Sequence, residues 1–202
     1  MGGIFSSNTE SILAHHQLYE RAGILHHDIS VNNLMVDAND HSVGILIDLD
    51  LAVRLKDGER RLTFEPVPAG TLAFRAIDVL DQGEFAHELH YRYDLESFFY
   101  TLVWILTYYP HSFSTPVCDW SEWYNMHPLA VANSKAGMFF RASAIMPDGP
   151  LKESWLLKLA NLFVKGQNLL AGDEDTDKET MGGYLTYQKF MAVLDPKSLG
   201  NR

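Results

Sequence analysis

The chain has 202 residues, of which 47% are hydrophobic and 12% aromatic, and its formal net charge is −10. This composition predicts one folded domain with a substantial core. The negative charge argues against non-specific binding to nucleic acid or to an anionic membrane, because both need a basic face. Cys118 is the only cysteine, so no intrachain disulfide can form and we expect an intracellular protein, cytoplasmic or nuclear.

The first expected element is a helix within residues 1–23. The segment Ser7–Thr9 supplies N-cap residue types, and Gly23 supplies a C-terminal stop. Between them Ile12 and Tyr19 recur at helical spacing. We therefore expect a helix of about three or four turns that starts near residue 10 and leads into the next segment.

Residues 24–50 read ILHHDISVNNLMV, a turn-rich DANDHS and then VGILIDLD, which predicts a loop followed by two short strands. Asp28, Asn33 and Asp48 are polar residues in otherwise apolar surroundings. Two carboxylates and an amide that meet on a β-ribbon suit the activation of a hydroxyl beside a magnesium-bound phosphate. Any one of the three alone would more simply cap a turn or end a strand.

Two motifs in this segment resemble known ones. HHDISVNN resembles the protein-kinase catalytic loop, HRD followed five positions later by Asn, and IDLD resembles the DFG segment. With DLESFFYTLVWI further along, they resemble the fungal-type protein kinases in particular. The resemblance implies that Asp28 is the catalytic base and that Asn33 and Asp48 bind Mg²⁺ and, through it, ATP. His26 and Ser30 are supporting residues beside Asp28.

The sequence departs from the kinase pattern at several positions. His27 replaces an arginine that grips a phosphorylated activation segment, so we predict activity that is independent of phosphorylation at Thr63. Ser30 stands where many serine/threonine kinases have a lysine that steadies the γ-phosphate. Asp50 replaces the glycine of DFG; it is either a helper ligand or, as we expect, a turn-capping residue.

Residues 51–80 are expected to form the activation segment. A long polar stretch with Pro66 and Pro68 predicts a loop, which ends in GTLAFRAID. This ending resembles the kinase segment that closes in APE, with Thr71 in the Gly-Thr pair and Asp78 in place of the glutamate. Asp78 either meets a basic partner late in the chain or is a solvated carboxylate on a short helix.

The apolar run FFYTLVWILTYY predicts a central helix over residues 92–109, too short to span a membrane. Asp94, at its start, matches the kinase aspartate that accepts backbone hydrogen bonds from the catalytic loop. Helices are expected over 118–195, with the acidic run 172–179 as a solvated loop without calcium. Adjacent histidine pairs and His87–His90 have poor ligand spacing, so we predict no zinc.

The fold predicted by the resemblance is mainly α with a small β-ribbon: a protein-kinase C-terminal lobe over residues 1–198, a tail over 199–202, and no N-terminal lobe. The predicted function is transfer of the ATP γ-phosphate to a protein hydroxyl, more in keeping with serine/threonine than with tyrosine kinases. The predicted partners are a protein substrate and a complementing N-terminal lobe in trans, with no nucleic acid and no membrane. The alternatives are a non-catalytic kinase-fold module, or pseudokinase, and a small-molecule phosphotransferase.

Overall fold

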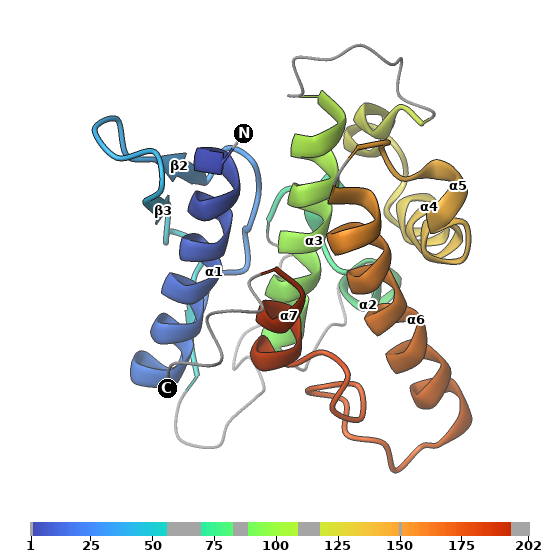
Figure 1. Ribbon diagram of the computed structural model, residues 1–202. Coiled ribbons are helices and arrows are strands. Elements are labelled where there is room, and N and C mark those ends of the chain that lie inside the picture. The colour runs from blue at the N-terminus through green and yellow to red at the C-terminus, as the bar shows by residue number, and fades with distance from the viewer. Residues whose placement is uncertain (1, 56–69, 83–88, 109–117, 150, 195–202) are drawn as a thin grey trace.

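The computed structural model describes residues 2–55, 70–82, 89–108, 118–149 and 151–194 (Figure 1). Thr63, residues 56–69 of the predicted activation segment, the end of the predicted central helix and the tail lie outside the described residues. Within these ranges, no helix is both long enough and apolar enough to cross a membrane.

The N-terminal helix is longer than its sequence predicts. Helix α1 runs over Gly2–Ala22, so the predicted caps at Ser7–Thr9 lie inside it. Each polar residue in a helix interior lowers the stability of the helix by only about a few tenths of a kcal/mol, which is too little to end the helix there. The predicted C-terminal stop is present: Gly23 has φ +62°, and its N–H donates to Tyr19 O at 2.8 Å.

Four short strands follow α1 and form two antiparallel pairs. Strand β1 (Ile24–Leu25) pairs with β4 (Val53–Arg54), and β2 (Leu34–Val36) pairs with β3 (Gly44–Leu46). Leu34 and Leu46 are cross-strand partners that pack on the core, whereas Met35 and Ile45, the next pair, are exposed. The β2–β3 ribbon therefore has one buried face against α1 and one open face.

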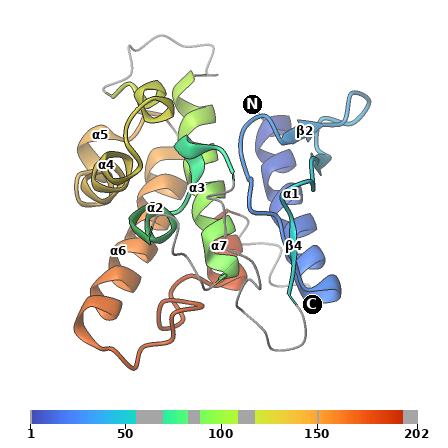
Figure 2. The same cartoon turned by 180° about the vertical axis from the view of Figure 1, so that it is seen from behind.

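Helix α3 (Tyr91–Tyr108) is the central element of the molecule. It lies between α1 on one side and α6 (Leu157–Gly172) on the other (Figures 1 and 2). Helix α7 (Tyr187–Leu194) packs against both α1 and the start of α3, because the Tyr187 ring contacts His15 and Tyr91. The first thirteen residues of α3, from Tyr91 to Val103, are all buried. A helix that is buried all round must satisfy its polar side chains internally, and this places several of them within reach of the site described below.

The remaining helices cover the side of α3 opposite α1. They are a 3₁₀ turn (Leu72–Phe74), α2 (Ile77–Gln82), a 3₁₀ turn (Trp120–Tyr124), α4 (Pro128–Phe140), α5 (Ala142–Ile145) and a π turn (Lys152–Leu156) that leads into α6. Phe139 of α4 joins three helices, because its ring stacks 5.4 Å from Phe99 of α3 and 4.9 Å from Phe163 of α6. The predicted fold class, mainly α with a small β-ribbon, is confirmed.

Candidate active site

The carboxylate of Asp28 joins two segments that are distant in sequence. Its Oδ2 accepts a hydrogen bond from Asn33 Nδ2 at 3.0 Å, and the same nitrogen donates to the Asp28 carbonyl at 2.8 Å. Its Oδ1 accepts from Thr71 N at 2.7 Å and from Thr71 Oγ1 at 2.9 Å. Both oxygens are held by donors, so the plane of the carboxylate is fixed from two sides.

Asp48 follows the ribbon at the end where Asn33 lies. Ile47 N donates to Asn33 O at 3.0 Å just beyond the end of β3, and Asp48 is the next residue. Asp48 is exposed and has φ +64°, in the left-handed region that a non-glycine residue seldom adopts. Such backbone strain is concentrated at functional sites in proteins, which makes Asp48 a candidate ligand.

Asp50 does not act as the predicted cap. The turn bond runs the other way: Asp50 N donates to Asp48 Oδ1 at 3.4 Å. An aspartate can accept from the N–H two residues ahead of it, and in IDLD two residues compete for that role. The first of them takes it, and the carboxylate of Asp50 is exposed.

Asp94 holds the backbone just before Asp28. Its Oδ2 accepts from His26 N at 2.8 Å and from His15 Nε2 at 2.6 Å, and its Oδ1 accepts from His27 N at 3.1 Å. Burial opposes ionisation, but His15 and the backbone donors outweigh it and lower the pKa of Asp94 to about 2. His27 has φ +63°, so Asp94 stabilises a strained turn that leads into Asp28. The bonds to the loop backbone are those that the resemblance predicted.

The histidine and serine around Asp28 are buried. His26 Nε2 lies 3.0 Å from Ile47 O, and His26 Nδ1 accepts from Asp28 N at 3.3 Å, which ties the loop to the end of β3. Ser30 is also buried, and within the described structure its Oγ has no hydrogen-bond partner. Burial lowers the pKa of His27, although nearby Asp94 acts in the opposite direction. A neutral imidazole cannot replace the phosphate-gripping arginine of the kinase pattern.

The segment that carries Thr71 approaches the loop very closely. Gly70 has φ +86°, and a Cβ at this position would lie 2.4 Å from His27 O. Only glycine allows this contact. Arg75 Nε donates to Gly70 O at 2.8 Å, Lys135 Nζ donates to Arg75 O, and Glu96 Oε1 accepts from Ile77 N at 2.8 Å. Residues 70–77 are thus held by side chains of α3 and α4.

Lys135 and Glu96 are unusual anchors because both are fully buried. Lys135 Nζ lies 3.8 Å from the centre of the Tyr100 ring, and burial holds the pKa of Lys135 well below its ordinary value. Burial likewise raises the pKa of Glu96, whose Oε1 also accepts from Tyr100 OH. Burial thus favours the neutral form of both groups, by lowering the pKa of the Lys135 amine and raising that of the Glu96 carboxyl. Both side chains anchor the segment that follows Thr71.

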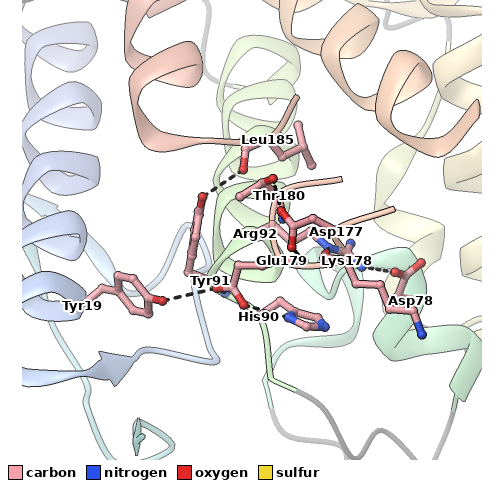
Figure 3. A network of polar contacts seen from close by, with 10 residues as sticks. All are labelled: Tyr19, Asp78, His90, Tyr91, Arg92, Asp177, Lys178, Glu179, Thr180 and Leu185. Atoms are coloured by element: carbon pink, nitrogen blue, oxygen red, sulfur yellow. Dashed lines mark hydrogen bonds and ion pairs between the residues drawn. The ribbon is translucent and has the colours of Figure 1, made fainter. Parts of the chain in front are cut away.

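The basic partner of Asp78 is Arg92, at the start of α3 and not late in the chain. Figure 3 shows Asp78 paired with Arg92 Nη2, while Arg92 Nε donates to Lys178 O at 2.6 Å. The ion pair fixes the end of residues 70–78 to α3, and the second bond carries the contact on to the α6–α7 connection. A planar guanidinium suits this because it donates in two directions from one plane.

The acidic run 172–179 is not a fully solvated loop. Glu179 is buried: it accepts from Tyr19 OH at 3.3 Å, pairs with His90 Nδ1 at 2.9 Å and lies 3.4 Å from Tyr91 N (Figure 3). Its neighbours Asp173, Asp175 and Asp177 are exposed. Charge density predicted solvation for the whole run, but a buried donor cluster at the start of α3 selects one of its acids.

Sequence reasoning missed five residues of this arrangement: His15, Arg92, Glu96, Lys135 and Glu179. His15 and Lys135 each lie on a helix face shared with apolar residues, and that position was the available signal of burial. Nothing in the sequence indicates which distant groups they contact.

Exposed apolar side chains gather around the ribbon. Met35 (52% exposed), Ile45 (40%) and Leu49 (49%) lie close to Asn33 and Asp48 in sequence, and Val36, Val43 and Leu51 are exposed as well. The described residues contain no group of three or more His, Cys, Asp or Glu side chains placed to hold a metal ion. Asn33 and Asp48 are instead an amide and a single carboxylate, which is the sparse protein donor set that Mg²⁺ commonly combines with phosphate and water oxygens.

A comparison with known protein families matches residues 4–106 to the family described as fungal protein kinase. The matched residues include the loop with Asp28, the ribbon with Asn33 and Asp48, the Thr71 segment and most of α3. A search of curated proteins found no match.

Proposed function

Because the chain belongs to the fungal protein kinase family, we propose that residues 24–55 and 70–78 contribute the phosphoryl-transfer half of a serine/threonine protein kinase site. The observation that carries the proposal is the Asp28 carboxylate, held by Asn33 on one side and by Thr71 on the other. The substrate is a protein hydroxyl, and the phosphoryl donor is ATP.

Asp28 orients the hydroxyl that attacks. Its two oxygens are fixed by three donors, so its remaining lone pairs point in set directions. Proton transfer is late in a loose phosphoryl-transfer transition state, so an ordinary carboxylate is basic enough and its position matters most. Thr71 donates to Asp28 Oδ1 from both its N–H and its hydroxyl, and so keeps the carboxylate from rotating.

Asn33 and Asp48 would hold the metal. The Asn33 amide nitrogen donates twice to Asp28, which turns its carbonyl oxygen away from that residue. Asp48 presents an exposed carboxylate from a strained backbone at the same end of the ribbon. An amide oxygen and one carboxylate fit Mg²⁺, which when bound would neutralise charge on the phosphates.

The open face of the ribbon suits the base of the nucleotide. Met35 and Ile45 are cross-strand partners, both exposed, and Met35 lies two residues after Asn33, which directly precedes β2. Directly paired residues of neighbouring strands share a face, so Met35 and Ile45 form an apolar surface close in sequence to the proposed metal ligand Asn33. Planar aromatic ligands bind such apolar surfaces, with a few polar groups fixing their orientation.

A second lobe would complete the site. The residues before Asp28 contain neither a glycine-rich phosphate loop nor a strand lysine, and the open face of the ribbon exposes the apolar side chains of Met35 and Ile45. We therefore include a complementing lobe, on another polypeptide or on further chain, as a partner of this surface.

Two alternatives lead to different results. A non-catalytic kinase-fold module would keep the packing around α3 without turnover, and the buried, unpartnered Ser30 hydroxyl, in place of a phosphate-steadying lysine, favours it. A small-molecule phosphotransferase would accept alcohols or amines in place of peptides. Labelled ATP tested against a peptide library and against small alcohols and amines separates these enzyme classes.

The direct test is calorimetric titration of the chain with Mg·ATP. We expect binding by the chain that Asp48→Ala weakens by roughly tenfold or more, the cost of one charge-assisted metal ligand. Asp175→Ala removes an exposed carboxylate from the α6–α7 connection and is the matched control. Equal affinities in the two variants would remove Asp48 from the site, and an absence of binding by the unmodified chain would favour the non-catalytic module.

A further inference from the structure

The Asp94 carboxylate accepts a hydrogen bond from outside the loop that precedes Asp28. Besides the N–H groups of His26 and His27, its Oδ2 receives His15 Nε2 at 2.6 Å. His15 is on α1, 79 residues before Asp94, and is completely buried. Its ring also meets Phe98 edge-on at 5.7 Å. The orientation of Asp94 therefore depends on α1 as well as on α3.

The second nitrogen of His15 contacts the last described helix. Tyr187 OH is hydrogen-bonded to His15 Nδ1, and the Tyr187 ring stacks on Tyr91 at 4.9 Å with an interplanar angle of 15°. In a neutral imidazole with its proton on Nε2, Nδ1 accepts a hydrogen bond from Tyr187 OH; in a protonated imidazole, Nδ1–H donates a hydrogen bond to the tyrosine oxygen. Both ring nitrogens are engaged in either state, so the ring cannot rotate without breaking a buried hydrogen bond.

We infer that Tyr187 and His15 are positioning residues: through Asp94 they fix the backbone at His26 and His27, and so set the orientation of Asp28. Helix α7, far from Asp28 in sequence, is thereby coupled to the loop. His27 has a left-handed backbone, which persists only where neighbouring groups stabilise it, so the loop depends on its hydrogen bonds to Asp94. The link to the loop stands on the contacts alone; its catalytic consequence depends on the proposed function.

Amide hydrogen exchange at His26 and His27, followed by NMR, tests the inference. In Tyr187→Phe we expect both amides to exchange roughly tenfold faster, because His15 loses the hydrogen bond that fixes its ring against Asp94, and the loop then opens locally more often. Amides within α6, such as that of Phe163, should stay within about twofold of the unmodified chain. The matched control is Tyr19→Phe, which removes a hydroxyl from the same aromatic cluster but contacts Glu179 instead of His15.

Two outcomes would overturn the inference. One is equal exchange at His26 and His27 in Tyr187→Phe and Tyr19→Phe. The other is uniform acceleration that includes α6, which would show that Tyr187 only stabilises the whole fold.

Replacement of His15 separates hydrogen bonding from packing. Gln can still donate an N–H to Asp94, whereas Leu fills the space without a donor. We expect His15→Gln to retain most of the protection at His26 and His27, and His15→Leu to lose it. Equal protection in both variants would contradict the inference; if His15→Leu does not fold, Tyr187→Phe decides.

The exchange experiment is independent of the activity. Failure of the unmodified chain to bind Mg·ATP would defeat the proposed function, yet Tyr187→Phe would still release the loop amides. Where Mg·ATP does bind and peptide phosphorylation is measurable, Tyr187→Phe should lower kcat and leave the nucleotide affinity within about twofold, because α7 acts on Asp28 and not on the proposed metal ligands.

Discussion

Replacement of Asp94 by asparagine should destabilise the fold by an amount that can be derived from its contacts. The side chain is 4% exposed and accepts hydrogen bonds from His15, His26 and His27. Asparagine has nearly the same shape, but its amide nitrogen cannot accept and it carries no charge to attract His15. Asp94→Asn therefore tests the carboxylate without opening a cavity.

The pKa of Asp94 gives the magnitude. It is lowered to about 2, against an ordinary value of about 3.9 for aspartate. At about 1.4 kcal/mol per pKa unit, ionisation of this group stabilises the folded state by roughly 2–3 kcal/mol at pH 7. With the unpaired backbone donors left behind, Asp94→Asn should lower the free energy of unfolding by about 2–4 kcal/mol.

The pH dependence has a definite sign. Because the pKa in the folded state is depressed, the stabilisation is fully present above the unfolded pKa near 4 and is lost as the pH falls towards 2. The difference in unfolding free energy between the unmodified chain and Asp94→Asn should thus narrow by roughly 1 kcal/mol between pH 7 and pH 3.

Urea unfolding of both proteins at pH 7, 5, 4 and 3 measures this difference. Asp175→Asn, which removes an exposed carboxylate, is the control and should stay within about 0.5 kcal/mol of the unmodified chain at pH 7. The reasoning fails if Asp94→Asn is no more destabilising than the control, or if its effect is the same at pH 3 as at pH 7.

Three further substitutions test the anchors of the Thr71 segment by urea unfolding. Gly70→Ala should cost roughly 1–3 kcal/mol more than Gly183→Ala, because both have left-handed φ but only the first would meet His27 O; equal costs would contradict the close approach. Lys135→Met removes a buried amine whose pKa is depressed by burial; the unmodified chain should gain stability relative to this variant from about pH 7 to pH 10, because its unfolded state binds the extra proton. Arg92→Lys should cost about 2–4 kcal/mol, since an ammonium cannot serve Asp78 and Lys178 O from one plane, whereas exposed Arg141→Lys should be neutral.

The sequence predicted those parts of the structure that depend on local pattern. A continuous apolar run indicated the central helix, and turn residues between apolar segments indicated the β2–β3 ribbon. The spacing of Asp28 and Asn33 predicted a shared loop, where the two side chains are hydrogen-bonded. Each of these features arises within a few turns or strands of chain.

The partners of the buried polar groups could not be predicted in this way. His15 meets Asp94 across 79 residues and Tyr187 across 172, and the Asp78 partner, Arg92, lies only 14 residues away, where the resemblance suggested a later one. A long side chain can reach several neighbours, and packing of whole helices decides which one it meets. Hydrophobic pattern fixes which face is buried and leaves these pairings open.

Helix α3 explains how two distant segments meet at Asp28. Arg92 and Glu96 are four residues apart and so lie on one side of the helix, where they hold Asp78 and Ile77 N. Asp94, between them in sequence, is rotated by about 200° to the opposite side, where it holds the loop before Asp28. Helix α3 thus positions the loop before Asp28 with one side and residues 77–78 with the other. The hydrogen bonds from Thr71 to Asp28 then join the two segments directly. A substitution at any of these three helix positions should therefore disturb the orientation of Asp28, although none of them touches it.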